Sequence, residues 1–133
     1  MKILGISCFY HDAAAALCVD GTIVAAAEEE RFSRKKHDSG FPKQAIDFCL
    51  RFANVKISDL DYVVFYEKPF IKMERLLTSY LATWPRSYRS FITAMPVWLR
   101  EKMHIPSVIR KETGYEGEIL YTCLLYTSDA ADE

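Results

Sequence analysis

The sequence predicts an α/β protein whose mixed sheet begins with three consecutive antiparallel strands. Three short apolar runs lie within the first 27 residues. Asp20-Gly21, a pair typical of tight two-residue hairpins, separates the second run from the third. An amphipathic helical pattern and a fourth strand-like run follow, so the expected order is strand, strand, strand, helix, strand.

The three apolar runs extend from Lys2 to Cys8, from Ala13 to Asp20 and from Ile23 to Ala27. The first bend falls at Phe9-Tyr10-His11-Asp12 and the second at Asp20-Gly21. The polar segment from Glu28 to Gly40 is expected to leave the sheet as a loop or short irregular piece.

A helix is expected to start near Pro42, because the fixed φ of proline suits a first helical turn. Apolar residues then recur at helical spacing, and Asn54 is expected to close the helix. These apolar positions are Ala45, Ile46, Cys49, Phe52 and Ala53. A strand from Leu60 to Tyr66 follows, because Val63, Val64 and Phe65 favour extended structure.

The segment from Phe70 to Met103 is helical in period, but Pro85 and Pro96 are expected to kink or end its helices. Large side chains recur in steps of four, three, four and three, which places them on one helix face. They are Trp84, Tyr88, Phe91, Met95 and Trp98. Packing within the protein explains this stripe. A membrane-surface helix is the alternative, because Arg86, Arg89, Arg100 and Lys102 lie nearby.

The last two expected elements are a helix from Pro106 to Thr113, stopped by Gly114, and a strand from Glu118 to Thr122. The residues beyond it, 123–133, show neither helical nor strand period. They resemble the in-frame translation of a transposase adapter used in DNA library preparation. The native sequence is therefore expected to end near Thr122, with the gene continuing further. Without the tail, three acidic residues are lost and the formal net charge changes from −1 to +2.

The composition is that of an ordinary soluble domain. A chain of 133 residues with a net charge of −1 gives no reason to expect nucleic acid as a partner. No apolar run approaches the roughly 18 to 20 residues of a membrane span, and the N-terminus lacks a signal peptide, so a cytoplasmic location is expected. The cysteines show no metal-ligand spacing, and Cys8, Cys18 and Cys49 are expected to be small core residues.

The first bend carries the best candidates for catalysis, His11 and Asp12. A neutral imidazole can take a proton from a hydroxyl near pH 7, and a carboxylate can orient a polar substrate or help to hold a cation. The alternative is that Asp12 serves the turn itself, by bonding its own backbone.

A basic segment, Arg31 to His37, follows the third strand. Arginine can grip a phosphate with two hydrogen bonds and lysine as a point charge, so Arg31 and Lys35 are the first choices for binding a substrate or nucleotide. The alternative is a solvated surface paired with Glu28 to Glu30.

The element order matches the ribonuclease-H-like half-domain that sugar kinases, actin and the Hsp70 ATPases share. This chain would be a partial half-domain of that superfold. In those enzymes the first hairpin usually carries glycine and threonine beside phosphate. The bend here has no glycine, which disfavours a kinase or ATPase, although either remains an alternative.

Longer strings of the sequence resemble the O-carbamoyltransferase family that includes nodulation and antibiotic-tailoring enzymes. The matching pieces are Gly5-Ile6, His11 to Ala15, Val19 to Gly21, Ala27 to Phe32, Arg34 to His37, Gly40 to Pro42 and the later IPSVIRKETGYEGEILYT. The resemblance covers essentially all of residues 1–122. It implies that these residues form an incomplete N-terminal carbamoyltransferase domain, followed by the tail at 123–133.

In such enzymes a C-terminal domain makes carbamoyl-adenylate from carbamoyl phosphate and ATP. The N-terminal domain then passes the carbamoyl group to a hydroxyl of a small acceptor. The resemblance implies that His11 is the general base or the group that orients the acceptor, with Asp12 beside it. Because the adenylate-forming domain would lie downstream, this polypeptide alone is expected to be inactive.

The family also holds a divalent metal, usually iron, through a His-x-x-x-His pair just after the EILYT-like strand. The resemblance therefore implies that the metal ligands lie beyond Thr122, and His104 is a poor substitute for them. A third hypothesis is that the chain is not part of an enzyme but a non-catalytic binding or membrane-surface module built on residues 80–102.

Overall fold

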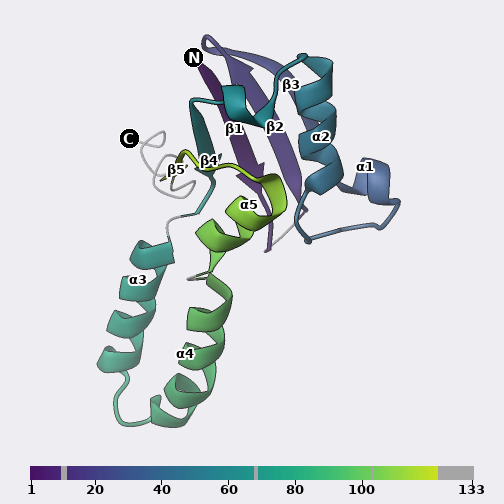
Figure 1. Ribbon diagram of the computed structural model, residues 1–133. Helices are drawn as coiled ribbons and strands as arrows, with labels where there is room; N and C mark the ends of the chain where they lie inside the picture. Colours follow the sequence, from purple (N-terminus) through teal and green to yellow (C-terminus); the bar gives the residue numbers. More distant parts are fainter. Residues whose placement is uncertain (10–11, 68, 103, 123–133) are drawn as a thin grey trace, which may run out of the picture.

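The computed structural model describes residues 1–9, 12–67, 69–102 and 104–122. They form a five-stranded mixed sheet with helices, as predicted (Figure 1). The strand order is β3-β2-β1-β4-β5. The predictions for His11 and for the tail at 123–133 lie outside the described residues.

The first three strands are antiparallel neighbours, which confirms the prediction. They are β1 (Lys2–Ser7), β2 (Ala14–Val19) and β3 (Thr22–Glu28). Asp20 (φ 50°) and Gly21 (φ 83°) both occupy the left-handed region, as a two-residue turn between twisted strands requires. The hairpin signal in the sequence was therefore correct.

Two parallel strands complete the sheet. β4 (Tyr62–Phe65) pairs with β1, and β5 (Glu118–Tyr121) pairs with β4. The short 3-10 helix η1 (Ile57–Asp59) precedes β4. The carboxyl ends of β1, β4 and β5 therefore meet at one edge of the sheet, and the first bend follows β1 at that edge.

The core lies where two helices, α2 (Lys43–Phe52) and α5 (Ile105–Thr113), pack against one face of the sheet. Leu4, Leu17 and Phe65 from the sheet are fully buried, and Ala45, Cys49 and Ile109 from the helices lie in the same cluster. Both helices end as predicted, because Asn54 (φ 53°) and Gly114 (φ 71°) adopt the left-handed conformation just after the last turn.

The helix α2 begins directly after Pro42, as predicted. Two other details of the sequence prediction were wrong. The first is Phe52, which is 66% exposed because it lies at the border of the apolar stripe, beside Phe48. The second is Cys18 in β2, which is only half-buried, because its side chain belongs to the sheet face opposite α2 and α5.

The segment from Phe70 to Met103 forms a pair of helices, α3 (Pro69–Ala82) and α4 (Tyr88–Lys102). Figure 1 shows them side by side, extending away from the sheet. Pro85 lies in the turn between them, as predicted, but Pro96 lies inside α4 and does not end it. Trp84 also lies in the turn, so the predicted aromatic stripe is not one continuous helix face.

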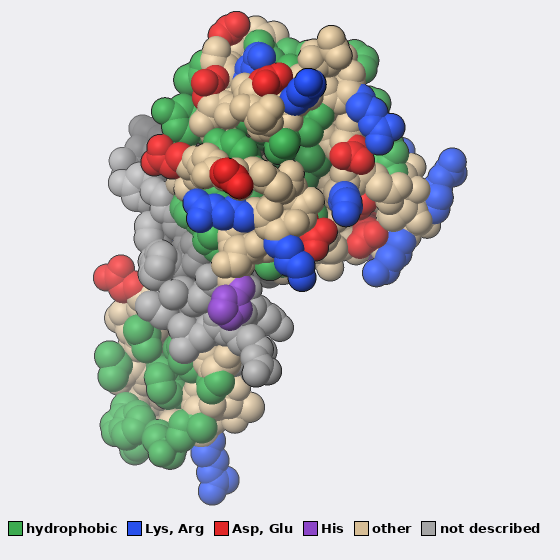
Figure 2. All heavy atoms as spheres, in the orientation of Figure 1, with side chains coloured by type: hydrophobic (Ala, Val, Ile, Leu, Met, Phe, Trp, Pro, Cys, Tyr) green, Lys and Arg blue, Asp and Glu red, His purple; other side chains and the backbone are tan. Residues whose placement is uncertain are grey.

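The far end of this pair, which we call the helical tip, exposes four large apolar side chains. They are Leu81, Trp84, Tyr88 and Ile92. Figure 2 shows apolar side chains gathered over this part of the molecule. Among the described residues, no helix combines the length and the apolar character needed to cross a membrane.

Candidate functional site

The first bend joins the carboxyl end of β1 to β2, at the edge where the parallel strands end. In open α/β sheets this edge is where ligands usually bind. Phe9 has a φ of 69°, a conformation that few non-glycine residues adopt. His11 lies outside the described residues, so Asp12 is the predicted catalytic residue whose position the structure gives.

A second loop, residues 34–40, is hydrogen-bonded along this bend. The Phe9 amide donates to the carbonyl of Ser39 at 2.8 Å, and the Ala13 amide donates to the carbonyl of Asp38 at 2.7 Å. The carbonyl of Ala13 in turn accepts from the Glu29 amide at 2.8 Å. Backbone bonds therefore hold the bend on both sides of Asp12.

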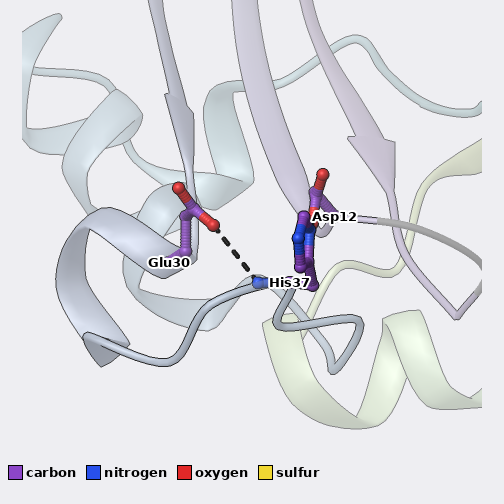
Figure 3. Close-up of side chains that lie close together, drawn as sticks. All are labelled: Asp12, Glu30 and His37. Atoms are coloured by element: carbon purple, nitrogen blue, oxygen red, sulfur yellow. Dashed lines mark hydrogen bonds and ion pairs between the residues drawn. The ribbon is translucent and has the colours of Figure 1, made fainter.

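Side chains from three segments meet at this junction. The Nδ1 atom of His37 lies 3.0 Å from Oδ1 of Asp12, and the His37 amide donates to Oε2 of Glu30 at 3.3 Å. Figure 3 shows His37 between Asp12 on the bend and Glu30 on the single-turn helix α1 (Glu30–Ser33). A carboxylate oxygen only accepts, so Nδ1 of His37 carries the proton in this contact.

Sequence reasoning missed this grouping. Asp12 and His37 are 25 residues apart, and no periodicity relates them. The family-like string Arg34 to His37 contains His37, but the sequence alone placed His37 in the basic segment and not beside Asp12.

Asp38 shapes the loop beside this group. Its Oδ1 atom accepts the Gly40 amide at 3.1 Å, and this bond, with a smaller contribution from Ser33, holds the pKa of Asp38 below its usual value. The Asp38 side chain thus fixes the turn in which the Asp38 carbonyl accepts the hydrogen bond from the Ala13 amide.

The two predicted ligand-binding residues occupy different surroundings. The Arg31 side chain is 75% exposed, with Nε 3.9 Å from Glu28 Oε2, and it lines a cavity of about 710 Å³. Lys35 lies with Nζ 4.0 Å from Asp38 Oδ1 and does not line that cavity. Neither shares a hydrogen bond or ion pair with Asp12 among the described residues. Their predicted role in ligand binding stays a prediction.

The cavity beside Arg31 has a floor of small residues. Gly5, Ser7, Ala14, Ala16 and Ala26 line it. Phe32, Phe48 and Tyr66 add aromatic surface, and Glu28 adds a carboxylate. Most of this lining is apolar, so the cavity fits an apolar or mixed group better than a bare phosphate.

Glu29 is the second residue that sequence reasoning missed. Its side chain is buried, 5% exposed, and its carboxylate points at the first turn of α2. Oε2 accepts the Ala45 amide at 2.8 Å, while Oε1 accepts the backbone and side-chain amides of Gln44 at 3.2 Å each. The carboxylate therefore accepts hydrogen bonds from free amides at the positive N-terminal end of α2. These bonds tie Glu29, and with it the start of α1, to α2.

The metal that the family resemblance implies needs a His-x-x-x-His pair. The three histidines stand at 11, 37 and 104, so no such pair exists in this sequence. Asp12, Glu30 and His37 do offer three ligand atoms within 4.8 Å of one another. These atoms are solvent-accessible and the group is bonded internally, so the grouping does not identify a metal site.

Comparison with known proteins identifies the family. The family model described as "Carbamoyltransferase N-terminus" matches residues 2–128. The chain therefore belongs to the carbamoyltransferase family and corresponds to its N-terminal part. The match includes the whole of the described bend, loop and sheet.

Relatives of this chain occur in two bacteria and an archaeon. An uncharacterized protein of Synechocystis, sll1178, is 55% identical over 116 residues, which are 87% of this chain and 19% of that protein. The nodulation protein NolNO of Sinorhizobium fredii is 43% identical over 53% of this chain and 11% of its own length. The uncharacterized protein MJ1051 of Methanocaldococcus jannaschii is 43% identical over 46% of this chain and 11% of its own length.

The chain thus spans about a fifth or less of the length of these three relatives. Among solved structures, YeaZ from Pseudomonas aeruginosa aligns with 51% of this chain and 30% of its own, at 17% identity and a TM-score of 0.38. A similarity this low carries no argument about the fold.

Proposed function

We propose that this chain is the N-terminal part of an enzyme that transfers a carbamoyl group from carbamoyl-adenylate to a hydroxyl of a small acceptor. The carbamoyl-adenylate would be made from carbamoyl phosphate and ATP by a C-terminal domain that these residues do not include. The observation that carries the proposal is the placement of Asp12 in a chain of this family. Its side chain sits on a hydrogen-bonded bend at the carboxyl edge of the parallel strands.

The chemistry needs a base beside the acceptor. The acceptor oxygen attacks the carbamoyl carbon, a new C–O bond forms, and the bond from that carbon to the adenylate oxygen breaks, so AMP leaves. The hydroxyl proton must go to a protein group, because a neutral hydroxyl is a poor nucleophile. We assign this role to His11, with Asp12 orienting either the base or the acceptor.

Arg31 and Lys35 are proposed as ligand-binding cations. Both lie within or just after α1, on the side of the bend where Glu30 and His37 meet. Their ion pairs with Glu28 and Asp38 are long, at 3.9 and 4.0 Å, and both cationic side chains are 75% exposed, so an anionic ligand could replace either carboxylate at little cost.

The strand order β3-β2-β1-β4-β5, with β2 antiparallel to its neighbours, also supports a partial ribonuclease-H-like half-domain. A kinase or ATPase of that superfold is the runner-up. Such enzymes use glycine to bring phosphate close to the backbone, whereas here Phe9 takes the left-handed position in the bend. Its side chain would obstruct that approach.

Reading the gene beyond Thr122 is the most direct test. We expect the gene to contain codons for a His-x-x-x-His string and for a downstream adenylate-forming domain. We also expect codons 123–133 of the present sequence to match the adapter, and the source genome to have different codons at those positions. A stop codon shortly after Thr122 in the source genome would contradict the proposal. So would carbamoyl transfer by the purified 133-residue chain, because we predict that the chain alone is inactive.

Activity of the full-length protein supplies the second test. The protein should release AMP from ATP in the presence of carbamoyl phosphate and a hydroxyl acceptor. His11→Ala should reduce acceptor-dependent turnover by about 100-fold or more, as loss of a general base does. The matched control is His104→Ala, because His104 is exposed at the start of α5 and its side chain caps no amide.

The helical tip supports a second candidate, a binding module for a membrane surface. Leu81, Trp84, Tyr88 and Ile92 are 48–72% exposed, and no acidic residue occurs between Arg75 and Arg100. Co-sedimentation with anionic vesicles that is lost in Trp84→Ala would favour this module. Co-sedimentation equal to that of a soluble control protein would exclude it.

A further inference from the structure

His37 has three properties that bear on its role. Its side chain is 72% exposed, so burial does not explain its place. Its φ is 55°, in the left-handed region that a side chain with a Cβ enters at a cost. Its backbone and its ring each contact a carboxylate, Glu30 on one side and Asp12 on the other.

The strained conformation makes both contacts available from one residue. The amide of His37 reaches back to α1 while its ring reaches forward to the bend. The next two residues then bond the bend directly, through the carbonyls of Asp38 and Ser39. His37 is therefore the point at which the loop turns from α1 onto the bend.

We infer that His37 is a positioning residue, whose Nδ1–H holds the carboxylate of Asp12 in a fixed orientation at the site. The bend itself is held by backbone bonds, so its main chain does not require the ring. The ring adds control over the direction of the Asp12 carboxylate, which is 43% exposed and would otherwise rotate in solvent. This inference rests on the proposed carbamoyl transfer only for its kinetic readout.

The chemistry of the contact sets the choice of variants. Asparagine can present its Nδ2 amide near the place of Nδ1, donates a hydrogen bond, and tolerates the left-handed conformation. Glycine accepts the same backbone without strain but has no donor. The pair His37→Asn and His37→Gly therefore differs in the hydrogen bond and not in the backbone requirement.

The kinetic test uses the full-length protein that carries this N-terminal sequence. We expect His37→Gly to lower kcat for acceptor carbamoylation by about 10- to 100-fold, the range for a misplaced reacting group. His37→Asn should stay within about 3-fold of the wild type, because the donor is retained. KM for ATP should not change in either variant, and His104→Asn serves as the control for loss of an exposed histidine.

A second readout is independent of activity. In protein labelled with ¹⁵N-histidine, the neutral His37 ring should carry its proton on Nδ1 and none on Nε2. Asp12→Asn should shift it toward the tautomer with the proton on Nε2, which is the usual one in water.

The two readouts separate the possible failures. An inactive wild type with the expected His37 tautomer would refute the proposed function and leave the contact established. A wild-type kcat in a folded His37→Gly variant would overturn the positioning role. Equal losses in His37→Asn and His37→Gly would overturn it too, because the donor would then be irrelevant. A His37 ring with its proton on Nε2 in the wild type would show that the contact does not form.

Discussion

The carboxylate of Glu29 caps a helix that begins fourteen residues later, since its Oε2 atom accepts the Ala45 amide at 2.8 Å. Pro42, the residue just before the helix, has no side-chain acceptor for the free amides of the first turn. Glu29 supplies that acceptor from the end of β3 and stays buried while doing so. The capping contact therefore links the bend, α1 and α2 into one unit.

Replacing this carboxylate should destabilise the fold. We expect Glu29→Ala to lower the free energy of unfolding by about 2 kcal/mol, because two backbone amides of α2 lose a charged acceptor. Urea unfolding followed by far-ultraviolet circular dichroism measures the change. Glu28→Ala is the matched control, since Glu28 is exposed and pairs with Arg31 only at 3.9 Å; it should change the value by less than about 0.5 kcal/mol. Equal losses in the two variants would argue against the cap.

The turn between β2 and β3 gives a second prediction. Gly21 has a φ of 83°, and an added Cβ would meet no atom within 4 Å. Gly21→Ala should therefore cost about 1 kcal/mol from backbone conformation alone. Gly5→Ala is the control, because its Cβ would make an ordinary 3.7 Å contact with the Ala16 carbonyl and Gly5 lies in a strand. A Gly21 variant as stable as the wild type would contradict the turn geometry.

The sequence predicted local features well and distant contacts poorly. Strand and helix order follow from hydrophobic period, and the stops at Asn54 and Gly114 follow from residues that tolerate positive φ. The role of Glu29 was missed because its partners lie fifteen and sixteen residues away and only the folded chain brings them together. Exposure of Phe52 was missed for a related reason, since period alone does not tell where the sheet beneath a helix ends.

The candidate site shows the same division. The bend and the residue Asp12 could be identified from the turn chemistry and the family-like strings around it. The partner of Asp12 could not, because a contact across 25 residues depends on how α1 and the loop fold back. Short-range patterns locate the bend of the candidate site, whereas tertiary structure supplies the groups that hold it.

Acid should loosen the loop beside the site. The Gly40 amide, with a smaller contribution from Ser33, depresses the pKa of Asp38 below its ordinary value of 3.8. A depressed carboxylate pKa stabilises the folded loop above the unfolded pKa, and this contribution is lost as pH falls through the lower folded value. The Ala13 amide, bonded to the Asp38 carbonyl, should therefore exchange faster with solvent below about pH 4. Asp38→Asn keeps the acceptor and removes the charge, so its exchange at Ala13 should lose this acid step; an unchanged step would assign it to another group.

The described cysteines should differ in reactivity with an alkylating reagent. Cys8 and Cys49 are buried, whereas Cys18 is partly exposed. Burial raises the pKa of the Cys49 thiol above its ordinary value of 9.0, which lowers the fraction of reactive thiolate, and the thiol also lies 3.6 Å from the Ala15 carbonyl. Brief treatment of the folded chain with iodoacetamide at pH 8, followed by peptide mass spectrometry, should therefore label Cys18 before Cys8 and Cys49. Labelling of all three at similar rates in urea provides the control, because unfolding removes the difference in access. Early labelling of Cys49 in the folded chain would show that α2 does not stay packed on the sheet.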